Sequence, residues 1–146
     1  MGYILLTGAF WVAFFMLVPR REWRRLYSQM LFGALCGTIA DLIGVGTFQW
    51  HYLGPTVCGL SLWADLGVAP AQAGLFAWSL RRFPRRSWLV WVFWILGNTF
   101  GEWFFVKRGW IIYGYWRPVK AFLFYLGFFA FLRLHGSFVA WLEGRT

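Results

Sequence analysis

Long apolar runs, separated by short polar or basic stretches, dominate the pattern of this chain. A helix needs about 20 mostly apolar residues to cross the hydrocarbon core of a bilayer. Five runs approach that length: residues 2–18, 30–48, 60–80, 87–106 and 118–134. They lack the alternation of a transmembrane β-barrel. The pattern therefore predicts an all-α integral membrane protein, a bundle of five transmembrane helices forming a single domain over residues 1–146.

The last run is the least regular of the five. It meets His135, Gly136 and Ser137 and then continues as FVAWL, so we expect either one tilted helix or a helix followed by an interfacial piece. The stretch GWIIYGYWRP before it is too short, and too rich in Gly and Pro, to span a bilayer. It predicts an aromatic interfacial loop or a re-entrant turn.

Composition supports a membrane protein. Hydrophobic residues make up 60% of the chain and charged residues only 13%, whereas soluble domains carry about 25% charged residues. A soluble domain of this size could not hide 12 Trp and 17 Phe without large apolar patches. The lipid bilayer is thus the expected main partner. The first run lacks a basic leader and a cleavage site, which predicts a retained helix.

The net charge of +9 is concentrated in two loops. Eight of the 14 basic residues form the clusters VPRREWRR and LRRFPRRSW between apolar runs. Such clusters lie on the cytoplasmic side, which predicts the N-terminus outside and the C-terminus in the cytoplasm, and argues against a nucleic-acid partner. The segment from Lys107 to Lys120 would then lie outside with four positive charges, so these need local partners or the span count is wrong.

Three of the five acidic residues lie inside apolar runs: Asp41, Asp65 and Glu102. An ionisable side chain at the centre of a transmembrane helix costs about 2.5–3.5 kcal/mol and is a functional candidate by default. With the topology above, all three fall in the outer half of the bilayer. The basic residues of the outer loop gather at the same level.

Helical spacing predicts that these acids face protein. Gly33, Gly37 and Asp41 recur every four residues on one face, and Gly33–Gly37 is a G-x-x-x-G of the kind that lets helices approach closely. In the fourth run Asn98 and Glu102 share a face in the same way.

Two further features point in the same direction. Gly97 and Gly101 form a second G-x-x-x-G beside Glu102, and Asp65 shares a face with Gln72 in the third run. Pro70 removes the hydrogen bond to the carbonyl of Leu66 and predicts a kink there. Because small residues can serve contacts within or between chains, a homo-oligomer is one expected assembly.

The predicted site is a carboxylate pocket in the outer half, with a basic rim and an aromatic turn. Its residues are Asp41, Asp65, Asn98, Glu102, Gln49, His51, Lys107, Arg108, Arg117 and Lys120. Closely placed acids cannot all ionise cheaply, so one of them could exchange a proton. The expected ligand is a hydrophobic or charged small molecule.

Three functions fit this pocket. One is a protein that binds or translocates a small substrate, with or without coupling to protons. The second is a cofactor-free enzyme acting on a lipid or isoprenoid, with Asp41 or Glu102 as proton donor and aromatic faces stabilising a cation. The third is a structural subunit whose acids form ion pairs with the outer basic residues.

Several other chemistries have no support in the sequence. There is no nucleotide-binding loop, nucleophile elbow or HExxH motif, and neither Cys36 nor Cys58 has metal-ligand spacing. We therefore expect neither a cofactor nor a metal.

Four features occur in a fixed order along the chain: a first span ending in VPRREWRR, the acid of TIADLIG, the turn Gln49-Trp50-His51-Tyr52, and IIYGYWRP before the last helix. This order resembles an uncharacterised family of small five-span membrane proteins from endospore-forming Gram-positive bacteria. The resemblance covers most of the chain. It implies a multi-pass protein of the bacterial cytoplasmic membrane and carries no established activity, so it transfers no catalytic residue.

Overall fold

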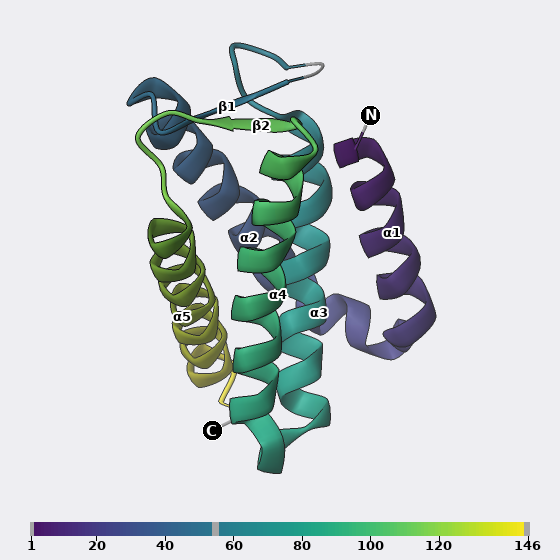
Figure 1. The fold of residues 1–146 in the computed structure, drawn as a ribbon. Coiled ribbons are helices and arrows are strands. Elements are labelled where there is room, and N and C mark those ends of the chain that lie inside the picture. Colours follow the sequence, from purple (N-terminus) through teal and green to yellow (C-terminus); the bar gives the residue numbers. More distant parts are fainter. Residues whose placement is uncertain (1, 54–55, 145–146) are drawn as a thin grey trace.

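The computed structural model describes residues 2–53 and 56–144. Five α-helices run up and down past one another, with the two ends of the chain at opposite ends of the bundle (Figure 1). They are α1 (Gly2–Leu17), α2 (Arg20–Gly46), α3 (Ala69–Arg82), α4 (Ser87–Lys107) and α5 (Pro118–Leu142). A π-helix, η1 (Trp63–Val68), leads into α3, and a 3-10 turn, η2 (Pro84–Arg86), leads into α4.

The prediction of an all-α architecture is confirmed, and each predicted span contains a helix. The length and composition of the helices single out fewer than five membrane-spanning segments. Three helical segments are long and apolar enough to cross a membrane: Arg20–Gly46, Pro84–Lys107 and Pro118–Leu142. The apolar helix Gly2–Leu17 is shorter than a usual span.

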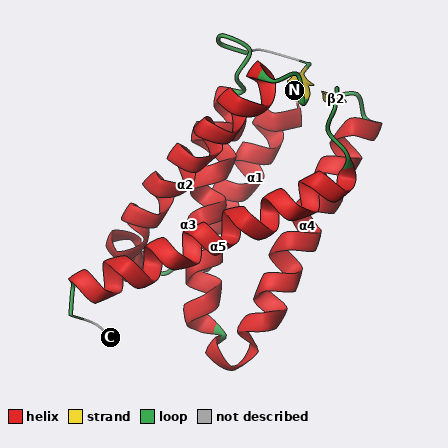
Figure 2. Ribbon diagram, turned by 90° about the vertical axis from the view of Figure 1, so that its left-hand side faces the viewer, coloured by secondary structure: helices red, strands yellow, loops and turns green. Residues whose placement is uncertain are grey.

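Two helices extend beyond their predicted spans, one at its start and one at its end. The cluster after residue 19 is helical, so α2 begins at Arg20, ten residues before the predicted start. Arg, Glu and Leu are good helix formers, and Pro19 directly precedes the first turn. At the other end of the chain, α5 runs without a break through His135 to Leu142, which selects the single long helix (Figure 2).

A two-stranded antiparallel sheet closes one end of the bundle (Figure 1). It pairs β1 (Trp50–Tyr52) with β2 (Ile111–Tyr113), placing Trp50 opposite Tyr113. The sequence predicted a loop or re-entrant turn for the second of these segments. Strands of three residues are too short to show alternation, so the pairing could not be read from the pattern. We call this end of the molecule the sheet end.

The glycine stripe of α2 packs against α3, as predicted. A methyl group added at Gly37 would lie 3.0 Å from the Cβ of Ala69 and 3.7 Å from a carboxyl oxygen of Asp65. One at Gly33 would collide with Ala73. Close approach of the two backbones therefore depends on these positions having no side chain.

Gly33→Leu is expected to destabilise the bundle by about 1–3 kcal/mol, because overpacking forces backbones apart. Thermal unfolding of the purified protein in detergent measures the change. Gly8→Leu is the matched control, since a Cβ at Gly8 meets no atom within 4 Å. Equal unfolding temperatures for the two variants would show that the α2–α3 contact is not tight.

The tightest packing lies away from the sheet end. Phe14, Leu26, Phe76, Phe129 and Leu132 are at most 2% exposed and belong to one cluster contributed by four helices. The outward surface, in contrast, is rich in exposed apolar side chains, such as Leu5 and Met16. An apolar exterior of this kind suits contact with lipid.

Candidate functional site

An elongated cavity of about 580 Å³ lies beside the packed cluster. Helix α1 packs on η1 and α3, while α4 packs on α3 and α5. The cavity occupies the space between α1 and α4, over α3. Its lining includes Asp41 from α2, Asp65 from η1 and both Asn98 and Glu102 from α4. The structure thus brings together the four polar residues that formed the core of the predicted pocket.

The cavity extends further than the predicted outer-half pocket. Its lining runs along α1 from Tyr3 to Leu17, 14 residues apart, which is about 21 Å at 1.5 Å per residue. The three acids lie near the sheet end, which we call the acid end of the cavity. The opposite, apolar end is lined by Ala13, Leu17, Leu75, Trp78 and Phe128, together with Ser79. The Ser79 hydroxyl donates to the Leu75 carbonyl at 2.7 Å and is therefore satisfied locally.

Asp65 reaches the cavity from the π-helix η1. This wider turn directly precedes Pro70, the residue for which a kink was predicted. Pro70 has no N–H to donate back to the preceding turn, and the chain accommodates this with a π-helical segment. Such segments often occur at functional sites, and this one carries an acid that is only 3% exposed.

Asp41 and Asp65 form a close pair of carboxyl groups at the acid end. The Tyr52 hydroxyl donates to Asp41 Oδ1 at 2.6 Å, and the two acids lie within interaction distance of each other. In each residue Oδ2 is buried and receives no hydrogen bond from the part of the chain that the structure describes. Two buried carboxyl groups this close need a shared proton or a cation.

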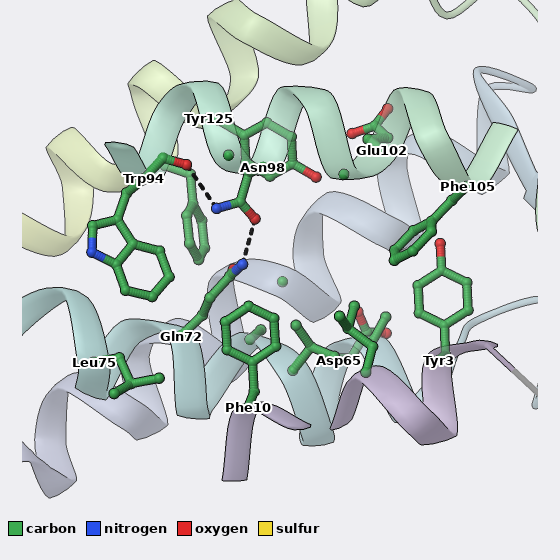
Figure 3. Close-up of a pocket in the computed structure, with 18 of the residues that line it drawn as sticks. Tyr3, Phe10, Asp65, Gln72, Leu75, Trp94, Asn98, Glu102, Phe105 and Tyr125 are labelled. Atoms are coloured by element: carbon green, nitrogen blue, oxygen red, sulfur yellow. Dashed lines mark hydrogen bonds between the residues drawn. The ribbon is translucent and has the colours of Figure 1, made fainter. Parts of the chain in front are cut away.

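Glu102 lies on the opposite wall and is held by side chains from the sheet end. The Tyr113 hydroxyl and the Trp116 indole N–H both donate to Oε1 at 2.7 Å. Figure 3 shows the Tyr125 hydroxyl directed toward the same carboxyl group. These donors fix the carboxyl group so that it faces the cavity.

The two strand tyrosines are permanent hydrogen-bond donors. Burial, reinforced by Asp41, raises the pKa of Tyr52 well above its ordinary value. Burial, reinforced by Glu102, likewise raises the pKa of Tyr113. Both phenols therefore stay protonated at physiological pH and keep donating to the carboxyl groups.

An amide pair crosses the middle of the cavity. Gln72 Nε2 donates to Asn98 Oδ1, and Asn98 Nδ2 donates to the Trp94 carbonyl at 2.8 Å (Figure 3). This chain connects α3 with α4 and separates the acid end from the apolar end.

The predicted basic rim does not contact the acids. Within the described residues, Asp41, Asp65 and Glu102 form no ion pair with Lys or Arg, whereas Glu22 pairs with Arg25 and Arg81. The basic residues of the sheet end instead contact aromatic rings and neutral polar groups: Lys107 over Trp103, Arg108 over Phe104, and Lys120 on Gln49 Oε1 and the Tyr115 carbonyl. The predicted ion-pair network was therefore wrong.

Six of the predicted site residues lie outside the cavity lining: Gln49, His51, Lys107, Arg108, Arg117 and Lys120. The sequence placed them at the correct end of the bundle, but proximity along the chain did not give orientation. His51 alternates with the inward Trp50 and Tyr52 on β1 and is exposed. The alternation of the strand therefore turns it away.

The sequence missed the aromatic partners of the acids. Tyr52 belonged to the predicted aromatic turn of the site, but Tyr3, Tyr113, Trp116 and Tyr125 were assigned no role as partners of the acids. The one signal for them was the polar tip of each ring, since a buried Tyr or Trp needs a partner.

The role predicted for the glycines of α4 was also wrong. A Cβ added at Gly97 or Gly101 would meet no atom within 4 Å, and both residues line the cavity. They therefore leave space open instead of packing a helix.

No protein-family model, curated protein or solved structure matches this chain. Within residues 2–53 and 56–144, no three His, Cys, Asp or Glu side chains form a group suited to a metal ion.

Proposed function

We propose that this chain is an integral membrane protein of five transmembrane helices that binds a small molecule in the cavity and translocates it in exchange for protons. The observation that carries the proposal is the placement of three acids in one cavity with no basic partner among the described residues. Intramembrane acids that structure alone requires are normally paired. Here one buried oxygen of Asp41 and one of Asp65 have no donor among the described residues, and a shared proton would satisfy them.

The five-span arrangement rests on the course of the helices, which run between the two ends of the bundle, with α5 crossing α3 and α4 obliquely (Figure 2). Helix α1 and the combined η1–α3 segment lie beside the three longer apolar segments (Figure 2). The two arginine clusters fall at the end opposite the sheet, where α1 meets α2 and α3 meets α4. The positive-inside rule then places the sheet end outside, in a bacterial cytoplasmic membrane.

Cysteine accessibility tests this topology. In a Cys36→Ala background, the exposed Cys58 is expected to react with a membrane-impermeant maleimide in intact cells. Arg85→Cys, made with Cys58→Ser, is expected to react only after permeabilisation. The reverse pattern would invert the topology, and reaction of both in intact cells would refute a membrane crossing by the η1–α3 segment that lies between them.

The transport proposal is tested in proteoliposomes that enclose a pH-sensitive dye. A panel of amphiphilic compounds with positive, neutral or negative head groups is added outside. At least one compound is expected to drive proton movement that empty liposomes lack, and Asp41→Asn is expected to abolish it. Glu22→Gln, an acid outside the cavity, is the control. Failure of the whole panel, or an unaffected Asp41→Asn, would overturn the proposal.

A second function is favoured by the aromatic rings of the lining. Phe10, Trp94 and Phe105 share the cavity with the acids (Figure 3). A proton donor beside aromatic faces could generate and stabilise a carbocation of an isoprenoid. Mass spectrometry of lipids from cells that express the protein, or its Glu102→Gln variant, distinguishes this enzyme from a transporter.

A further inference from the structure

We propose that the occupant of the cavity is a cationic amphiphile, with an ammonium head at the acid end and an alkyl tail along the apolar end. This inference rests on the proposed function, that the cavity binds a small molecule. It adds the charge of the head, the shape of the ligand and the route of entry.

The charge of the lining indicates a positive head. Three lining residues are acids, and none of the described lining residues is Lys, Arg or His. Asp41 is 5% exposed and Asp65 3% exposed, and each keeps one buried oxygen without a donor. A buried acceptor without a donor costs free energy. A protonated amine at this end supplies the positive charge and the N–H donors that the carboxyl groups favour.

The surroundings favour an organic cation over a metal ion. Ca²⁺ and Mg²⁺ need six or more oxygen ligands, or retained waters, and the described residues form no metal-ligand group. The acid end is lined instead by aromatic side chains that attract ammonium groups through their ring faces. Tyr3 and Phe105 lie near the acids there (Figure 3).

The shape of the cavity indicates a tail. The lining continues past the Gln72–Asn98 pair to Leu17 and Trp78, over most of the length of α1. No carboxyl group lies among the lining residues of the apolar end. A compact hydrophilic cation would leave this part of the cavity empty, whereas an alkyl chain fills it.

The wall between α1 and α4 supplies an entry route from lipid. Two aromatic contacts bridge these helices: Tyr3 with Phe105, ring centroids 5.3 Å apart, and Phe10 with Trp94, 6.3 Å apart. Between Trp94 and Phe105 the α4 side of the wall carries Gly97 and Gly101, whose added Cβ would meet open space. Gly97 is also exposed. This gap opens onto the apolar outer surface of the helices. An amphiphile dissolved in the lipid could enter the cavity there.

Calorimetry with dodecylamine and dodecanol tests the charge of the head. The two compounds have the same chain, but the amine is protonated at neutral pH. The protein is held in lipid nanodiscs, and empty nanodiscs correct for partitioning. Dodecylamine is expected to bind about 10- to 100-fold more tightly than dodecanol, as hydrogen bonds to charged groups allow. Asp65→Asn is expected to remove most of this difference, while Glu22→Gln preserves it.

Butylamine tests the tail, and is expected to bind far more weakly than dodecylamine after the same correction. Equal binding of dodecylamine and dodecanol would overturn the inference and leave a binding cavity in place. Tight binding of butylamine would overturn the inference that the ligand carries an alkyl tail. If neither long-chain compound binds, the inference also falls, and the dye-loaded proteoliposomes decide separately whether the proposed function survives.

Discussion

Gly101→Trp is expected to abolish ligand binding and transport while the protein stays folded. Gly101 lines the cavity in the gap between the two aromatic contacts of α1 and α4. A Cβ there meets no atom within 4 Å, and the cavity of about 580 Å³ is large enough to take an indole. It would occupy space next to Glu102 that a ligand needs. We expect affinity for dodecylamine to fall by more than about 10-fold, the cost of losing roughly 1.4 kcal/mol of binding free energy.

The matched control is Gly127→Trp on α5. A Cβ at Gly127 also meets no atom within 4 Å, but Gly127 does not line the cavity. Nanodisc calorimetry measures binding for both variants, and thermal unfolding shows whether they remain folded. A folded Gly101→Trp variant that binds as well as the unaltered protein would show that the ligand does not use this cavity.

The sequence predicted the positions of the helices and the orientation of Asp41 toward another helix better than it predicted the contacts that the acids make. Apolar run length is a property of a local segment, so each predicted span contains a helix. The four-residue spacing of Gly33, Gly37 and Asp41 correctly predicted a face against another helix, because helical periodicity fixes which residues share a face.

The contacts at the acid end depend on tertiary structure that no local pattern encodes. Tyr52 and Tyr113 reach Asp41 and Glu102 because β1 pairs with β2, a strand that begins 61 residues later in the sequence. Charge balance pointed to ion pairs with Lys107 or Lys120. Instead, Tyr52 donates to Asp41, and Tyr113 and the Trp116 indole donate to Glu102. The ammonium groups remain at the polar edge.

The four glycines of the two G-x-x-x-G motifs illustrate the same limit. Gly33 and Gly37 contact α3, while Gly97 and Gly101 border open space. Both arrangements need a missing side chain, one for contact and the other for volume. The motif alone therefore cannot separate a packing interface from a cavity wall.

Phe76→Ala is expected to have the opposite effect to Gly101→Trp: a large loss of stability with ligand affinity retained. Phe76 is 1% exposed and packs against Phe129, Trp94 and Trp91, with ring centroids 4.7, 6.4 and 5.5 Å away. Removing a buried Phe side chain costs about 3–5 kcal/mol, because the neighbours lose contacts that they cannot restore. Phe76 does not line the cavity, so binding below the unfolding temperature should persist.

Phe131→Ala on α5 is the control for Phe76→Ala, because its side chain is 61% exposed and makes contact with lipid in the proposed orientation. The free energy of unfolding of both variants can be measured by denaturant titration in detergent, and dodecylamine affinity by calorimetry at low temperature. Equal losses of stability would show that the Phe76 cluster is not the stabilising core. Loss of binding in a folded Phe76→Ala variant would show that core and cavity are coupled. Binding that persists in a destabilised Phe76→Ala variant would show that the Phe76 cluster stabilises the bundle without holding the ligand, although Leu75, Trp94 and Phe128 belong to both the cluster and the cavity lining.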